Sequence, residues 1–344
     1  MRWIFAAAAL AVASPSSSHQ APPQMDVKLD RSQADAALGI IDAANAGREP
    51  SAAELRTLFS SRPYIRLRER ENAMKRPFTD EEFIAHLRSA EVRGSAPGLR
   101  SALGGWNEDV IAAAAGRAYA YLPAGAKLRA TIFPMIKIKP NTFVFDLKND
   151  PSIFYAIDSK EPKAKFANTL AHEMHHIGLG QNCGDDDLAG SERLKSLRGW
   201  VGAFGEGLAM VAAAGGHDIH PHAVSTAEER GAWDSEAAKF STYLRQQDTF
   251  FRSVLAGTAG DKSAVDKAMF EYFGEQGPWY TVGWRMAVTI EQELGRPAVI
   301  GAFCRSHALL ATYNRAAEAY RSRTGQRLAT WTPSLANALA HGGQ

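Results

Sequence analysis

Apolar positions along the chain change from helical spacing to strand-like runs and back again. From Ser32 to about Arg117, apolar residues recur three to four positions apart, as they do on one face of a helix. The first such set is Ala36, Ala37, Ile40, Ile41 and Ala44. Thr79 with Glu82 three residues later is typical of a capped helix start. We therefore expect residues 31–125 to form an N-terminal helical part.

Between Leu128 and Ile157 the spacing changes to short apolar runs separated by turn residues. The runs are 131–133, 135–138, 143–147 and 153–157, with Pro134, Pro140 and Pro151 between them. After Pro162 helical spacing returns nearly to the end of the chain. Helices, a small sheet and then helices predict an α+β fold that is mostly helical. Residues 126–344 form its second part, separate from residues 31–125 or continuous with them.

The first eighteen residues have the layout of a secretory signal peptide. Met1-Arg2 is a basic start, residues 3–13 are an unbroken apolar run, and residues 14–18 are small and polar. We expect cleavage near residues 13–18, a linker at 19–30 and an exported protein, periplasmic or secreted. The alternative is an ordinary first helix packed in the core. No later stretch has the roughly 18 apolar residues of a membrane helix, so we expect no membrane span in the mature chain.

Composition narrows the class of protein. The chain of 344 residues is 45% hydrophobic and 22% charged, as in a globular protein with a buried core. Its 39 basic and 37 acidic side chains are interleaved, for example in residues 66–71, whereas a nucleic-acid-binding protein shows a basic block or stripe. We expect no nucleic-acid partner. The two cysteines, Cys183 and Cys304, form one disulfide in an oxidising compartment or remain two thiols.

One motif carries specific chemistry, His172-Glu173-Met174-His175-His176, which has the form HExxH. Positions i and i+4 share one face of a helix, so His172 and His176 can direct both imidazoles at one zinc ion. Glu173 lies about 100° around the helix, within reach of a water on the metal. The motif predicts one Zn²⁺ per chain. The alternative is an amphipathic helix that carries these histidines by chance.

A catalytic zinc usually takes a third protein ligand. Glu206 is the one charged residue in the stretch 200–214, where a buried unpaired carboxylate is costly and a cation stabilises it. We predict Glu206 as the third ligand, on a helix whose small residues Gly205, Gly207 and Ala209 let it pack close to the motif helix. An exposed glutamate at a helix start is the alternative. The other acidic candidates are Asp185, Asp186, Asp187 and Glu192.

HExxH followed by a glutamate on a second helix resembles the gluzincin metallopeptidases. The phrase Glu206-Gly207-Leu208-Ala209, thirty residues after His176, is similar to a group of uncharacterised bacterial zinc-dependent peptidases, as are residues 63–71 and 280–287. The resemblance covers about residues 30–310. It implies a zincin-like fold with the metal in a cleft between the sheet-bearing part and the helical part.

The resemblance also implies the reaction, zinc-dependent hydrolysis of a peptide or protein substrate. His172, His176 and Glu206 would hold the zinc, Glu173 would act as general base, and Tyr280 would stabilise the oxyanion, a role that gluzincins commonly give to a tyrosine or histidine. Simple packing beside Trp279 and Trp284 is the alternative for Tyr280. The strand at 152–158 would be a sheet edge along which an extended peptide adds.

A different class of protein remains open, a secreted binding module with a structural or vestigial zinc site. Such a site would need a fourth protein ligand, which Cys183 or the loop 217–222 could supply. The histidines of this loop are His217, His220 and His222. They form a second metal site or a solvated polar loop.

Overall fold

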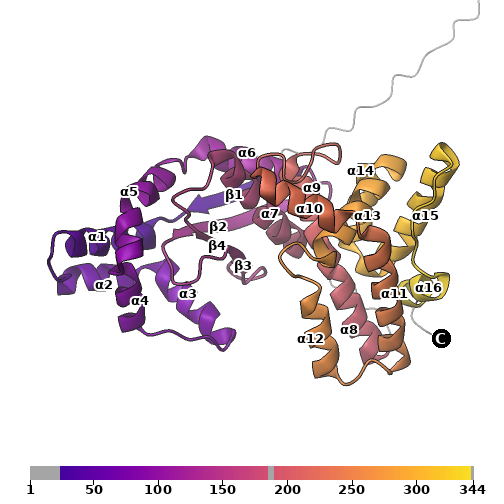
Figure 1. The fold of residues 1–344 in the computed structure, drawn as a ribbon, viewed down its shortest axis with the longest axis horizontal. Coiled ribbons are helices and arrows are strands. Elements are labelled where there is room, and N and C mark those ends of the chain that lie inside the picture. Colours follow the sequence, from indigo (N-terminus) through magenta and orange to yellow (C-terminus); the bar gives the residue numbers. More distant parts are fainter. Residues whose placement is uncertain (1–23, 185–189, 342–344) are drawn as a thin grey trace, which may run out of the picture.

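The computed structural model describes residues 24–184 and 190–341, and the fold is α+β and mostly helical, as expected. The predicted signal peptide and its cleavage position lie outside the described residues. Six helices precede most of the sheet in the chain. The first five form one end of the molecule, and the sixth lies beside the sheet and packs on α7 (Lys163–Asn182) and α9 (Gly205–Ala214) (Figure 1). The six are α1 (Ser32–Asn45), α2 (Ala52–Ser60), α3 (Arg62–Ala73), α4 (Asp80–Leu87), α5 (Ala90–Gly104) and α6 (Glu108–Tyr119). The predicted helix start at Thr79 is confirmed, since Thr79 and Glu82 form a reciprocal capping box.

A four-stranded sheet lies next to these helices (Figure 1). Its strands are β1 (Gln24–Leu29), β2 (Lys127–Met135), β3 (Phe143–Phe145) and β4 (Ser152–Ala156). Their order is β1-β2-β4-β3, with β3 antiparallel to β4 and the other pairs parallel. The prediction of an edge at residues 152–158 is wrong, because β4 pairs on both sides and β3 takes the edge. The continuous apolar run of β4 is typical of a strand buried on both faces.

Strand β1 lies in the span that the sequence assigns to a linker. Its residues pair in register with β2, from Gln24 opposite Lys127 to Leu29 opposite Ile132. Val27 and Leu29 pack against the core, while the charged Asp26 and Lys28 alternate with them. Two inward-facing residues are too few for a clear alternation of apolar and polar positions. The prolines before the strand favour a linker. The strand therefore depends on its pairing partner more than on its own sequence.

Eleven further helical segments follow the sheet within the described residues. They are α7 (Lys163–Asn182), α8 (Glu192–Val201), the short 3₁₀ segment η1 (Gly202–Phe204), α9 (Gly205–Ala214), α10 (Ala227–Ala237), α11 (Phe240–Ala256), α12 (Lys262–Glu271), α13 (Pro278–Leu294), α14 (Arg296–Cys304), α15 (Ser306–Thr324) and α16 (Pro333–His341), of which η1 is the only one that is not an α-helix. In the described parts of the chain, no helix is both long and apolar enough to cross a membrane.

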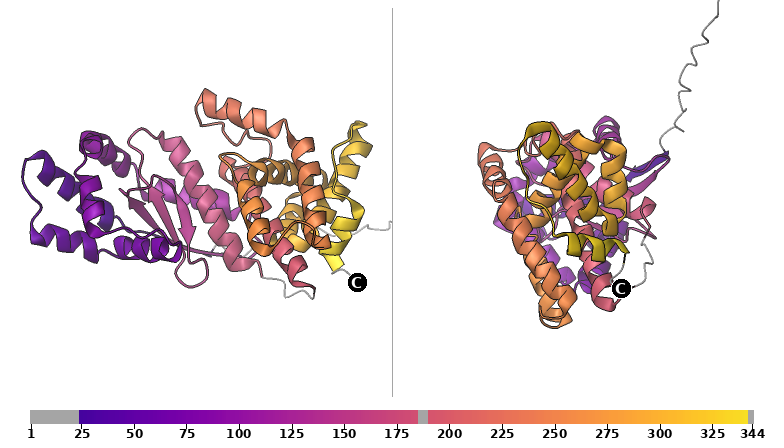
Figure 2. Two further views of the ribbon diagram at one scale, coloured as in Figure 1. Left: turned by 60° about the horizontal axis from the view of Figure 1, so that its bottom comes forward. Right: turned by 90° about the vertical axis from the view of Figure 1, so that its right-hand side faces the viewer.

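The buried apolar side chains form two clusters that meet near α7 and α9. One surrounds the sheet and includes Ile132, Phe154 and Leu170, and the other includes Phe204 and Trp279. The sheet and α7 lie between the N-terminal helices and the C-terminal helices (Figure 2). Residues of α7 and α9 therefore come together where the two halves of the molecule join.

Three arginines of α3 fasten this helix to the sheet. Arg62, Arg66 and Arg70 are spaced four residues apart and share one helix face. Their guanidinium groups lie 5.3, 5.0 and 3.8 Å from the ring centroids of Phe133, Phe145 and Phe143, respectively. Such cation–π contacts contribute about 0.5–2 kcal/mol each. Two of the three rings belong to β3, so α3 holds the edge strand in place.

Cys183 and Cys304 form a disulfide that joins the end of α7 to the end of α14, which confirms their pairing. The bridge spans a sequence separation of 121 residues. In the chain-entropy account, closing so long a loop stabilises the fold by about 4–5 kcal/mol. We expect the Cys183→Ala, Cys304→Ala double variant to lower the free energy of unfolding by several kcal/mol, measured by urea denaturation. Equal unfolding midpoints for the variant and the oxidised parent would contradict this.

Candidate metal centre

Three potential ligand atoms converge at the junction of α7 and α9. His172 Nε2 and His176 Nε2 each lie 3.0 Å from Glu206 Oε2, and the two nitrogens lie 2.9 Å from each other. Within the described residues, His172, His176 and Glu206 are the group of His, Cys, Asp and Glu side chains whose arrangement suits a metal ion. The structure thus brings together the three side chains that the sequence predicts as ligands.

The donor set fits Zn²⁺. Ligands about 2.0–2.1 Å from a tetrahedral zinc lie roughly 3.3 Å apart, close to the separations found here. Without a cation, two imidazole N–H groups cannot both point at one carboxylate oxygen while their nitrogens lie 2.9 Å apart. A cation removes this conflict, because every one of the three atoms then acts as an electron-pair donor.

The electrostatics of the cluster also favour a cation. Burial raises the pKa of Glu206, but the charges of His176 and His172 and their hydrogen bonds outweigh it and hold this pKa well below its usual range. Burial lowers the pKa of His176, but the Glu206 carboxylate outweighs it and raises this pKa to about 9. The carboxylate therefore stays ionised and attracts positive charge.

The motif helix is fixed against α6 and the segment that follows it. His175, between the two ligands in sequence, is fully buried, and its Nε2 lies 3.2 Å from the Tyr121 carbonyl oxygen. His175 thus contacts the backbone and is not one of the three clustered residues. At Gly178 an added Cβ would lie 2.4 Å from Leu122 Cδ1, so the helix approaches this segment closely. These contacts set the direction in which His172 and His176 point.

Helix α9 is held by α13 through backbone contact at Gly207. A Cβ at this position would lie 1.9 Å from Trp284 N and 2.1 Å from Gly283 C. Gly207 thus serves the packing of α9 on α13, whereas the sequence suggested that the small residues face the motif helix. At Gly205 nothing lies within 4 Å of an added Cβ.

This pair of glycines gives a matched test of the packing. We expect Gly207→Ala to lower the free energy of unfolding by about 3 kcal/mol or more, because rigid backbone atoms must move apart. The control Gly205→Ala is expected to be neutral or to stabilise by up to about 1 kcal/mol, since alanine favours the helix. Denaturant unfolding of both variants measures the difference. Equal stabilities would show that α9 and α13 separate easily.

Glu173 and Tyr280 both lie beside the three ligands. Burial raises the pKa of Glu173, although the charges of His172 and His176 act in the opposite direction. The Tyr280 ring faces the His172 ring at an interplanar angle of 21°, with centroids 6.4 Å apart. Burial, the charges of Glu206 and Glu173, and a hydrogen bond to Glu206 raise the pKa of Tyr280, which stays protonated as a donor. The structure therefore brings both predicted catalytic residues to the cluster.

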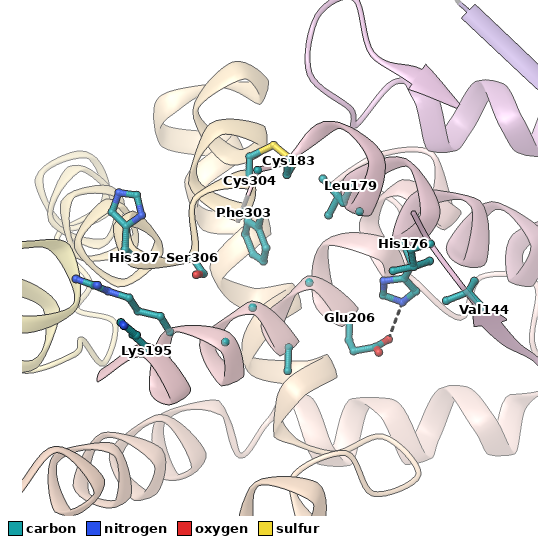
Figure 3. Close-up of a pocket in the computed structure, with 18 residues that line it drawn as sticks. Val144, His176, Leu179, Cys183, Lys195, Glu206, Phe303, Cys304, Ser306 and His307 are labelled. Atoms are coloured by element: carbon teal, nitrogen blue, oxygen red, sulfur yellow. Dashed lines mark hydrogen bonds and ion pairs between the residues drawn. A yellow bond between two sulfur atoms is a disulfide. The ribbon is translucent and has the colours of Figure 1, made fainter. Parts of the chain in front are cut away.

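A cleft of about 730 Å³ leads away from the cluster. His176 and Glu206 lie at one end, and Lys195, Ser306 and His307 lie at the other (Figure 3). Val144 from β3 and the disulfide also line it. No sequence motif marks Val144, Lys195, Ser306 and His307 as cleft residues, because they come from segments far apart in the chain.

The other residues considered from sequence have different surroundings. His217 lies 3.6 Å from Glu291, His220 bonds to Asp234, and His222 bonds to Ser225. The three histidines thus face separate partners and form no shared metal site. Glu192 is exposed and pairs with Lys195, so it is not a ligand, and Asp185, Asp186 and Asp187 lie outside the described residues.

The geometry defines a mostly helical α+β protein with an HExxH helix and a glutamate from a second helix at one centre. A family model described as "Putative zinc dependent peptidase (DUF5700)" matches residues 58–322. The chain belongs to this family. No curated protein and no solved structure matches the chain. The family description supports zinc as the metal and peptide hydrolysis as the class of reaction.

Proposed function

We propose that the protein is an exported, gluzincin-type zinc metallopeptidase, with His172, His176 and Glu206 as the zinc ligands. The observation that carries the proposal is the convergence of these three donor atoms within 3.0 Å of one another. The family description supports a peptidase. The disulfide supports export, because stable disulfides are typical of oxidising compartments.

The residues around the ligands have complementary roles in hydrolysis. Zinc bound here would polarise the scissile carbonyl and lower the pKa of a water. Glu173 would accept a proton from the attacking water and pass it to the leaving amine. Tyr280 would donate its phenolic hydrogen bond to the oxyanion that develops on the former carbonyl oxygen.

The sheet edge offers a way to hold an extended peptide. Strand β3 ends the sheet within the described residues, and Val144 at its centre lines the same cleft as His176. A peptide lying along β3 would add as a further strand and pass the metal ligands. The arginines of α3 keep this strand in position. A peptide substrate therefore suits this cleft better than a small amide does.

Tyr280→Phe tests the role of the phenolic hydroxyl. We expect kcat for peptide hydrolysis to fall by about 10²- to 10³-fold, as for loss of one oxyanion donor, with zinc content and KM little changed. Tyr320→Phe is the control, because the Tyr320 hydroxyl bonds to Gln326 away from the cluster. Steady-state kinetics on one cleaved peptide measures both. Full activity of Tyr280→Phe would leave Tyr280 with a packing role.

The function itself is tested with the purified mature chain. The expected results are one zinc per chain by elemental analysis and cleavage within a peptide library. A chelator should abolish cleavage, and added Zn²⁺ should restore it. X-ray absorption separates the enzyme from a binding module: an open position beside three protein ligands supports the enzyme, and four protein ligands would contradict it. The bonding of Cys183 in a disulfide disfavours a fourth protein ligand from this residue.

A further inference from the structure

A second cavity, of about 400 Å³, lies in the N-terminal half of the molecule. It is bounded by α3, the start of α4 and the segment that follows β2, and it shares no lining residue with the cleft at the metal centre. Its volume is within the range of roughly 300–1,000 Å³ that small-molecule sites occupy. The proposed peptidase chemistry makes no use of it.

The walls of this cavity combine apolar side chains with cationic groups. The apolar side chains are Leu67, Phe78, Phe83 and Ile138. The partly exposed Phe78 ring stacks on the fully buried Phe83 ring, with centroids 5.6 Å apart, and gives the cavity an aromatic wall. Arg76, Lys137 and Lys139 bring positive charge to the same space. An apolar wall beside cations suits a ligand that has a hydrophobic body and an anionic end.

Lys137 is the most unusual of these groups, because a lysine is seldom buried without an ionic partner. Its residue is only 7% exposed. Its ammonium group donates to Asn141 Oδ1 at 3.0 Å and lies 4.7 Å from the centroid of the Phe143 ring. No described carboxylate forms an ion pair with it. Burial lowers the pKa of Lys137 to about 7, although the charge of Glu71 acts in the opposite direction.

The one buried carboxylate nearby is already shared. Glu71 pairs with Arg70 at 2.5 Å and with Arg76 at 3.4 Å. Glu82, the other acidic residue of the cavity wall, is engaged in the capping box with Thr79. Arg76 Nε and Nη2 are buried and make no hydrogen bond within the described residues. The cavity wall therefore carries more positive than negative charge, and Arg76 Nη2 has no hydrogen-bond acceptor within the described residues.

We propose that this cavity binds a small amphipathic carboxylate, with the anionic group between Lys137 and Arg76 and the apolar body against Phe78 and Ile138. The carboxylate would accept hydrogen bonds from the Lys137 ammonium and from the free guanidinium hydrogens of Arg76. It would supply the negative charge that this buried lysine lacks. The hydrophobic body would replace water on the aromatic wall, which adds affinity in proportion to the area covered.

The test uses 4-phenylbutyrate as the probe, titrated into the full zinc-loaded chain by isothermal titration calorimetry. We expect saturable binding of one probe per chain. The neutral analogue 4-phenyl-1-butanol, which has the same apolar body, should bind at least about tenfold more weakly, as expected for losing a hydrogen bond to a charged group. Equal affinity for the two compounds, or no saturation at millimolar probe, would overturn the proposal.

Variants then locate the site. Lys137→Met keeps the length of the side chain and removes the charge, and it should weaken 4-phenylbutyrate binding about 10- to 100-fold. Lys160→Met is the matched control at an exposed lysine outside the cavity and should bind as the parent does. A carboxylate can also bind at zinc, but such binding would survive Lys137→Met, and that result would overturn the proposal. Should Lys137→Met not fold, Arg76→Gln carries the same expectation.

Discussion

Glu173→Gln is expected to lower the rate of peptide hydrolysis by about 10²- to 10⁴-fold while the protein keeps its fold and its zinc. Glutamine preserves the size of the side chain and a hydrogen-bonding end, but it cannot accept a proton from water. The three ligands are untouched, so zinc content and melting temperature should match those of the parent. Activity, zinc content and thermal melting of the same preparation together measure the outcome.

The control is Glu192→Gln, which makes the same chemical change at an exposed position of α8. It should leave activity, zinc and stability as they are. If Glu173→Gln hydrolyses peptides at the rate of the parent, Glu173 is not the base. If it loses zinc as well as activity, Glu173 contributes to metal binding, and the lost activity no longer identifies it as the general base.

Glu206→Gln should fail in a different way, by releasing the metal. The change removes the one anionic donor of the centre, while both imidazoles remain. Substitution of a residue that merely orients a ligand typically costs 10- to 100-fold in metal affinity, so loss of a direct ligand should cost about 100-fold or more. Hydrolysis should fall with zinc occupancy, and the rise in melting temperature that zinc gives the parent should largely disappear.

Competition with a chromophoric zinc chelator measures this affinity, and Glu192→Gln again is the control. If Glu206→Gln keeps zinc as tightly as the parent, the third ligand lies elsewhere. Asp185, Asp186 and Asp187 would then be the residues to substitute next, because they follow the end of α7. Glu192 is not among them, because its side chain is exposed and pairs with Lys195.

The metal cluster could be predicted from sequence because helix geometry is local. The spacing of His172 and His176 fixes their shared face once the segment is helical, and an isolated charge at Glu206 marks a carboxylate that needs a partner. The general order of helices and strands follows from the same local periodicity. Predictions of this kind use only the residues of one element.

Features that depend on distant partners were harder to predict. Strand β1 forms because it pairs with β2, and the edge position of β3 depends on the order of all four strands. The role of Gly207 depends on the backbone of α13, which lies more than seventy residues later in the chain. The cationic cavity combines α3 with the segment after β2. None of these pairings leaves a pattern within a single segment.

The disulfide can keep the metal centre assembled after another protease cuts the chain. His172 and His176 precede Cys183, whereas Glu206 and Tyr280 lie between Cys183 and Cys304. A single peptide-bond cut between the two cysteines leaves two fragments that the bridge still ties together. The tether keeps each fragment at a high effective concentration near the other, so both halves of the ligand set can stay assembled. After a cut between Cys183 and Glu206, reduction of the sulfur–sulfur bond would let the fragments part, and the metal would lose its third ligand.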